Sequence, residues 1–300
     1  MEIVHASVMI EEVLLYLQPV KEDGLLLDGT LGEGGHCEAF LSRFPRLRAV
    51  GLDADPAILE RARLRLGPCG ERFTGFHAWT DEFLRDYPLD ERPDRILLDL
   101  GISLFHYSRS GRGFSFGAEE PLDMRLWPSG GETAADILAS RDEKTLADLF
   151  FALGGERYSR RIARELVRRR AEKHIGSAKE FAEIVWNSVP ASYRHGRLHP
   201  ATRCFQALRI AVNRELERLD RMLSAALDIL PEGGRLGVIA FHSLEDRRSK
   251  TYLREQAAAG RCRLVTRKAV KPSGEECAAN PPSRSARLRV AEKTCEGGAA

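Results

Sequence analysis

Several features that mark particular classes of protein are missing from this sequence. Its cysteines are scattered and form no Cys-x-x-Cys pair; they stand at positions 37, 69, 204, 262, 277 and 295. This spacing indicates neither a zinc site nor a disulfide framework, so we expect no metal. No apolar run approaches the roughly 20 residues that a membrane span needs, and no basic start precedes a long apolar core. We therefore expect a cytoplasmic protein with reduced thiols and no membrane partner.

The composition that is present is ordinary, but the charge is unevenly distributed. The 300 residues are 43% hydrophobic and 30% charged, which suits one large domain or a domain with an insertion. Residues 1–100 hold 11 Lys+Arg and 19 Asp+Glu, a balance of −8, whereas residues 101–300 hold 35 and 25, a balance of +10. The basic surplus favours a polyanionic substrate that is bound by the later segments, although solvated helix faces would give the same count.

Residues 25–36 have the pattern of the first half of a nucleotide-binding βαβ unit. Three leucines that run into Asp28 predict the buried end of a parallel strand. The glycines that follow allow a tight turn and a close approach of backbone to a ligand. They are Gly29, Gly32, Gly34 and Gly35. From His36 onward the apolar spacing is helical.

A second strand, residues 49–52, ends at Asp53, where a carboxylate can accept hydrogen bonds from ribose hydroxyls. A dinucleotide fingerprint in this loop would need glycine at position 37, which is Cys37. Asp28 and Glu33 would also be an awkward lining for a pyrophosphate, whereas S-adenosylmethionine has no phosphate and a cationic end. The loop therefore favours a methyltransferase over a nicotinamide-dependent oxidoreductase.

Alternating strand and helix patterns occur in both halves of the chain and are interrupted between them. Further strands are predicted at 73–77, 95–99 and 235–241, with a terminal hairpin of strands near 262–267 and 285–290. The interruption contains a Gly-, Ser- and Arg-rich loop and three helical patterns, at 133–153, 156–173 and 177–189. An apolar stripe from Phe205 to Leu230 then predicts one long helix.

These patterns predict an α/β fold with a Rossmann-like, mostly parallel sheet and an inserted α-helical domain. We assign residues 1–108 and 203–300 to the sheet domain, residues 109–202 to an inserted substrate-recognition domain, and expect 296–300 to be disordered. The pattern at 156–173 carries eight basic residues and three acids, so a phosphate-facing role is as plausible as simple helix surface. Residues 261–293, with nine basic residues and three acids, are a second candidate RNA surface.

Specific sequence blocks follow one another along nearly the whole chain. They are Asp28-Gly-Thr-Leu-Gly with Gly34-Gly35-His36, Leu98-Asp99-Leu100-Gly101, Arg112-Gly-Phe-Ser-Phe116, Pro121-Leu-Asp-Met-Arg125, Arg160-Arg-Ile-Ala163, His199-Pro-Ala-Thr-Arg203, Phe205-Gln-Ala-Leu-Arg-Ile-Ala-Val-Asn213 and Phe241-His-Ser-Leu-Glu-Asp-Arg247. In these blocks the sequence resembles the bacterial 16S rRNA (cytosine-N4)-methyltransferase family, also called the MraW family.

The resemblance implies a class I S-adenosylmethionine-dependent methyltransferase that acts on the exocyclic N4 of a cytidine in the decoding region of 16S rRNA. It also implies a partner, 16S rRNA within the small ribosomal subunit or a late assembly form, and a homodimer is considered as well. The cofactor contacts that it implies are Gly34, Gly35, His36, Asp53, Phe83 and Asp99. His106 stands where the family has a cofactor-contacting glutamine.

Methylation of N4 needs a base, because this nitrogen is conjugated into the ring and must lose a proton. The candidates are Asp99 at a strand end, Asp123 in the Pro-Leu-Asp-Met-Arg block, and His242 with the neighbouring Glu245 and Asp246. Glu245 and Asp246 are equally well explained as the acidic first turn of a helix. A non-catalytic RNA-binding factor is the remaining alternative, and it would not need Asp53 or the glycine-rich loop.

Overall fold

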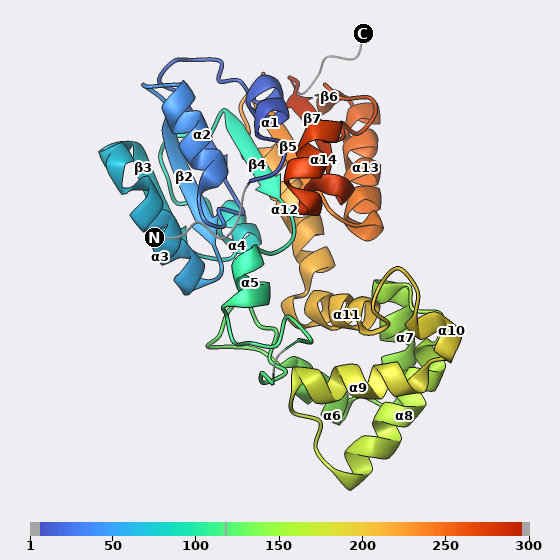
Figure 1. Cartoon of the computed structure of the whole chain (residues 1–300). Coiled ribbons are helices and arrows are strands. Elements are labelled where there is room, and N and C mark those ends of the chain that lie inside the picture. Colours follow the sequence, from blue (N-terminus) through green and yellow to red (C-terminus); the bar gives the residue numbers. More distant parts are fainter. Residues whose placement is uncertain (1–6, 118, 296–300) are drawn as a thin grey trace. The chain divides into compact units, whose positions relative to one another are not determined.

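The computed structural model describes residues 7–117 and 119–295, so the predicted disorder of 296–300 lies outside the described residues (Figure 1). The chain forms two compact units. The first contains the residues up to 103 together with those from 216 onward, and the second contains residues 104–215. The second unit includes the whole of the predicted insertion, 109–202, and extends beyond it at both ends.

The first unit contains a seven-stranded sheet of order β3-β2-β1-β4-β5-β7-β6. Its strands are β1 (Leu25–Asp28), β2 (Arg48–Asp53), β3 (Phe73–His77), β4 (Arg95–Asp99), β5 (Arg235–Ala240), β6 (Cys262–Leu264) and β7 (Arg287–Lys293). The first five are parallel to one another, whereas β7 is antiparallel to both β5 and β6. The predicted Rossmann-like, mostly parallel sheet is therefore confirmed, and the two late strands pair as expected.

Helices accompany the strands in the first unit. They are α1 (Ile10–Tyr16), α2 (Gly35–Arg43), α3 (Pro56–Leu66), η1 (Gly67–Arg72), α4 (Thr80–Arg85), α12 (Glu215–Ile229), α13 (Ser243–Ala258), α14 (Gly274–Ala279) and η2 (Pro281–Ser285). Because α14 and η2 lie between β6 and β7, the two strands are not joined by a tight hairpin turn. No helix in the described part of the chain is long and apolar enough to cross a membrane.

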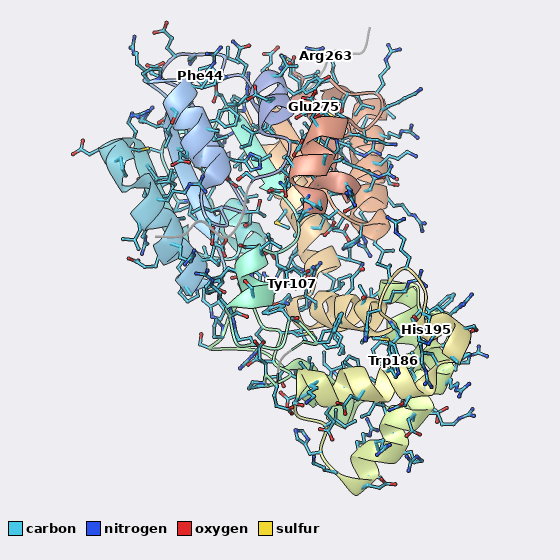
Figure 2. All side chains as sticks on the ribbon, in the orientation of Figure 1. Phe44, Tyr107, Trp186, His195, Arg263 and Glu275 are labelled. Atoms are coloured by element: carbon cyan, nitrogen blue, oxygen red, sulfur yellow. The ribbon has the colours of Figure 1, made fainter. Side chains whose placement is uncertain are left out.

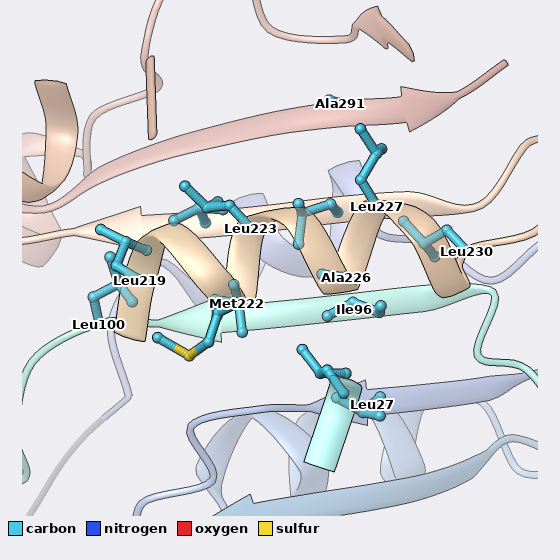
Figure 3. Close-up of a cluster of buried hydrophobic side chains, with 14 of the residues drawn as sticks. Leu27, Ile96, Leu100, Leu219, Met222, Leu223, Ala226, Leu227, Leu230 and Ala291 are labelled. Carbon is cyan, nitrogen blue, oxygen red and sulfur yellow. The ribbon is translucent and has the colours of Figure 1, made fainter. Parts of the chain in front are cut away.

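The apolar stripe of α12 is part of a hydrophobic core cluster of this unit. Leu219, Leu223 and Leu227 are buried together with Leu27 of β1 and Ile96 of β4 (Figure 3). Truncating such a leucine to alanine typically costs about 2–5 kcal/mol of stability. This packing fixes the central strands, whose carboxyl ends carry the acidic residues singled out in the sequence.

The second unit is helical. Its helices are α5 (Leu104–Ser108), α6 (Ala134–Ser140), α7 (Glu143–Gly154), α8 (Ser159–Glu172), α9 (Ala178–Ser188), α10 (Ala191–Arg194) and α11 (Ala201–Asn213). The single helix predicted over 133–153 is therefore wrong, since the structure has both α6 and α7 there. Arg141 is extended, and the Asp142 side chain accepts a hydrogen bond from the backbone N–H of Thr145 at 2.7 Å, which caps a new helix.

The long helix predicted from Phe205 to Leu230 is also wrong. It is broken between α11 and α12 at Arg214, whose φ of 51° is left-handed. The preceding Asn213 explains the break. Its amide donates to the carbonyl of Met124 at 2.8 Å, and its side-chain oxygen accepts from the N–H of Leu126 at 2.8 Å. The apolar spacing continues through the break because each of the two helices buries its own apolar side.

Candidate active site

The glycine-rich loop joins the carboxyl end of β1 to the start of α2. Gly34 is the N-cap residue of α2, with a φ of 80° that other residues rarely adopt. A Cβ at Gly34 would meet Leu66 Cδ1 at 2.9 Å, and one at Gly35 would collide with the hydroxyl of Ser7. Gly34 is thus favoured by its backbone conformation, and both positions have little room for a side chain unless Leu66 or Ser7 moves. Their predicted contact with a cofactor stays a prediction.

Asp53, at the end of β2, holds this loop in place. Its Oδ2 accepts a hydrogen bond from the N–H of Gly32 at 3.0 Å, and its Oδ1 accepts from the N–H of Asp55 at 2.8 Å. Burial is the main reason that the pKa of Asp53 is raised to about 7; the two backbone hydrogen bonds oppose the shift. The carboxyl group is therefore positioned by the backbone and titrates near neutral pH.

His36, in the first turn of α2, lies between two acidic strand ends. Its Nε2 is 3.3 Å from Oδ2 of Asp99 at the end of β4. Burial would lower the pKa of His36, but the hydrogen bond to Asp99 and the charges of Asp99 and Asp28 outweigh it and raise that pKa. Burial also raises the pKa of Asp28 to about 6. The three side chains form a coupled, mostly buried acid–base cluster, as expected where the ends of parallel strands meet.

This cluster has unused capacity for hydrogen bonding. Among the described residues, Nδ1 of His36 and Oδ1 of Asp99 are buried without a hydrogen-bond partner. Buried polar atoms are normally paired, so two such atoms at one sheet edge fit a polar ligand. Thr30 also contributes to this edge, because its Oγ1 accepts a hydrogen bond from the N–H of Asp99 at 2.5 Å. This residue was not among the predicted site residues. Its signal was a hydroxyl placed inside the glycine-rich loop.

Phe83, the aromatic candidate, lies in α4 and is only 9% exposed. Its ring packs against Phe76 at 5.2 Å and Tyr87 at 5.9 Å between centroids. The structure therefore shows a core role, and the cofactor contact of Phe83 stays a prediction. Trp79, which was not predicted, follows β3, and the Arg218 guanidinium lies 3.8 Å from the centroid of its ring. An aromatic residue just beyond a strand end was the available signal.

Two candidates belong to the helical unit. His106, in α5, is buried, and its ring centroid lies 5.3 Å from that of Phe114. Its predicted contact with the cofactor stays a prediction. Asp123 is bound at both oxygens by Arg125, at 2.8 and 2.7 Å. Burial would raise the pKa of Asp123, but these hydrogen bonds outweigh it and lower that pKa, which makes the carboxylate a weaker base.

His242 is the N-cap residue of α13. Its Nδ1 accepts a hydrogen bond from the N–H of Glu245 at 3.4 Å, while Glu245 accepts in return from the N–H groups of Phe241 and His242 at 2.9 and 3.2 Å. This reciprocal capping box confirms the helix-start explanation of Glu245. Asp246 instead pairs with Arg289 at 2.8 Å. The group after β5 therefore has a structural role, and a catalytic role for His242 stays a prediction.

Comparison with known proteins adds the identity of the family. The model of the MraW methylase family matches residues 2–294. Ribosomal RNA small subunit methyltransferase H of Treponema denticola is 54% identical, with 98% of each chain covered. The protein of the same name from Leptospira interrogans is 45% identical over 98% of this chain and 90% of its own, and that from Treponema pallidum is 43% identical over 96% and 92%. The chain belongs to the MraW methylase family.

Proposed function

We propose that the chain is an S-adenosylmethionine-dependent methyltransferase that methylates the exocyclic N4 of a cytidine in the decoding region of 16S rRNA. The observation that carries this proposal is the family match along nearly the whole chain, to a class I methyltransferase sheet. The relatives named above are ribosomal RNA methyltransferases. The acid–base cluster at the strand ends supplies the polar groups that such chemistry needs.

The residues at the strand ends fit this cofactor. S-adenosylmethionine supplies the methyl group when it is bound. Asp53 would accept hydrogen bonds from its ribose, and the unpaired atoms of His36 and Asp99 would meet further polar groups. The remaining proposed contacts are Gly34, Gly35, Phe83 and His106. A nicotinamide cofactor fits less well, because the buried Asp28 at the start of the glycine-rich loop would place a carboxylate against its pyrophosphate.

Among the three proposed catalytic residues, Asp99 is best placed to accept a hydrogen bond or a proton from the target amine. It lies at the carboxyl end of β4, its side chain is 15% exposed, and His36 holds one of its oxygens at 3.3 Å. Asp123 is neutralised by Arg125, and His242 is engaged in a helix cap. A positioned acceptor makes the amine nitrogen more nucleophilic and can receive its proton.

A direct test is methyl transfer by the full chain to small-subunit rRNA. With labelled S-adenosylmethionine, we expect label in the 16S rRNA, and nucleoside mass spectrometry should identify N4-methylcytidine. Assays on naked rRNA, on assembled subunits and on assembly intermediates would identify the substrate form. Label in a different nucleoside, or binding of RNA with no transfer to any of these forms, would contradict the proposal. The second outcome would favour a non-catalytic RNA-binding factor.

Helix α8 is the proposed rRNA-binding face of the helical unit, but its arginines differ. Arg168 and Arg169 lie 2.7 and 3.0 Å from Glu165, so their charge is already partly balanced. Arg160 and Arg161 are exposed. An exposed cation that is not already paired with a carboxylate gives up no ion pair when it binds a phosphate. The two pairs therefore provide a matched comparison on one helix.

Changing Arg160 and Arg161 to glutamine should weaken rRNA binding and reduce the slope of log affinity against log salt by about 2. The same change at Arg168 and Arg169 should have a clearly smaller effect, because it removes cations that Glu165 already neutralises. Filter binding at several salt concentrations would measure both slopes. Equal losses for the two pairs would mean that net charge alone determines binding, whether or not an arginine is already paired with Glu165.

Association with the small ribosomal subunit and a homodimeric state are also part of the proposal. An rRNA substrate supports a cytoplasmic location, since ribosomal subunits are assembled there in bacteria. Co-sedimentation with subunits and analytical ultracentrifugation of the free protein would measure the two assemblies. A protein that methylates rRNA but sediments as a monomer would remove the dimer from the proposal without affecting the activity.

A further inference from the structure

Three rings in the helical unit are stacked on one another. The imidazole of His199 is nearly parallel to the ring of Phe116, with centroids 4.3 Å apart and planes at 17°. Its other neighbour is Trp186 of α9, at 5.2 Å and 24°. All three side chains are partly exposed, whereas Phe181, in the same helix as Trp186, is fully buried. We call Phe116, His199 and Trp186 the aromatic stack.

Arg194 and His195 lie against Trp186, at one end of the aromatic stack. The guanidinium of Arg194 lies 5.9 Å from the centroid of Trp186, and it is held there by a hydrogen bond to the carbonyl of Val189 at 3.2 Å. The ring of His195 meets Trp186 edge-on at 6.2 Å, and both side chains are labelled in Figure 2. Flat apolar faces and fixed positive charge are therefore combined on one surface.

This combination matches unpaired nucleotides better than other ligands. Single-stranded RNA is recognised by stacking its bases on aromatic rings and guanidinium planes, with cations along the backbone. The bases of a duplex are already stacked and cannot use such a surface. His199 adds to the match, because burial lowers its pKa and keeps the imidazole an uncharged aromatic ring at neutral pH.

We propose that the aromatic stack, together with Arg194, binds an unpaired nucleotide of the RNA substrate by base stacking. The identity of that RNA rests on the function proposed above. The stack lies in the helical unit, and α8 provides the cationic face of the same unit. Within this unit, the arginines of α8 would thus supply sequence-independent affinity, and the aromatic stack would select an exposed base.

The test compares a short single-stranded RNA with an abasic oligomer of the same length and charge. The full chain should bind the intact RNA more tightly by roughly 5- to 150-fold, the usual range for one stacked base. Trp186→Ala should remove most of this preference, whereas Trp186→Phe should keep much of it. Trp127→Phe, in the same unit, is the matched control and should leave the preference unchanged.

A second measurement does not depend on the stability of Trp186→Ala. In a protein carrying Trp79→Phe and Trp127→Phe, Trp186 is the only tryptophan that remains. Intact RNA should quench its fluorescence, and the abasic oligomer should not. Equal binding of the two oligomers by the wild-type chain, or no quenching by intact RNA, would overturn the stacking proposal. Quenching by an added ribosomal protein instead would assign the surface to a protein partner and overturn it as well.

These results are separable from the proposed function. Methyl transfer to 16S rRNA by the wild-type chain, with no difference between intact and abasic oligomers, would refute the stacking site alone. A preference for intact RNA without methyl transfer to any form of the rRNA would refute the proposed function and leave the stacking site standing.

Discussion

Replacing Asp99 by asparagine is expected to lower the kcat of rRNA methylation by roughly 10²- to 10⁴-fold, the usual contribution of a positioned acid or base. Asparagine keeps the shape of the side chain and one oxygen that can face His36, whose Nε2 is 3.3 Å from Oδ2 of Asp99 in the wild-type chain. It cannot accept a proton, however, and it is a weaker hydrogen-bond acceptor than a carboxylate. The fold should therefore survive while the chemistry fails.

Asp99 is also a proposed cofactor contact, so the experiment must separate the two roles. If it only holds the cofactor, saturating S-adenosylmethionine should restore the rate of Asp99→Asn. If it acts on the target amine, kcat should stay low at saturation. Asp123→Asn and His242→Gln are the comparison variants. A larger loss of kcat in either of them than in Asp99→Asn would move the catalytic role to that residue.

The strand-end residues were predictable because the rules of parallel sheets are local. Asp28, Asp53 and Asp99 each end an apolar run, and the topology brings such ends to one edge of the sheet. Their partners were not predictable. The bond from Gly32 to Asp53 joins residues 21 apart in the sequence, and nothing in the loop itself specifies it. The sequence indicated which groups meet, but not which of their atoms are already engaged.

The wrong prediction of one helix from Phe205 to Leu230 has a different origin. A helix pattern reports only which side of the chain is buried, so it continues through the left-handed residue Arg214 between two helices. Asn213 causes that break through bonds to a loop 87 and 89 residues away in the sequence. At His242 the difficulty was chemical, since a histidine, unlike serine or aspartate, is not a usual capping residue. Its capping role became visible only from the return bond of Glu245.

Replacing Asp53 by asparagine should lower the affinity for S-adenosylmethionine at pH 8 by roughly 10- to 150-fold, the range for a hydrogen bond to a charged group. The structure adds a pH dependence to this prediction. With a pKa of about 7, the wild-type carboxyl group is mostly protonated at pH 6 and mostly ionised at pH 8. The ionised form accepts two ribose hydroxyls better than the acid, so wild-type affinity should rise by about tenfold over this range.

The same shift predicts the opposite trend for stability of the free protein. Asp53 and Asp28 have pKa values of about 7 and 6 in the folded chain, and about 4 when unfolded. Between about pH 4 and 7 the folded state therefore binds more protons than the unfolded state. The stabilising contribution of these two carboxyl groups is lost as the pH rises through their pKa values in the folded chain. Thermal melting without cofactor should show this loss, and Asp53→Asn should reduce it.

Calorimetry from pH 5.5 to 8 would test the affinity, with the exposed Asp90→Asn as a control that should retain the wild-type profile. His106→Gln belongs in the same series, because protonation of a histidine beside a sulfonium would also weaken binding on the acid side. If Asp53 carries the effect, Asp53→Asn should be weak and flat while His106→Gln still rises with pH. A flat profile in His106→Gln with a normal rise in Asp53→Asn would assign the titration to His106. Unchanged affinity in a folded Asp53→Asn would mean that Asp53 serves only the loop, through Gly32 and Asp55.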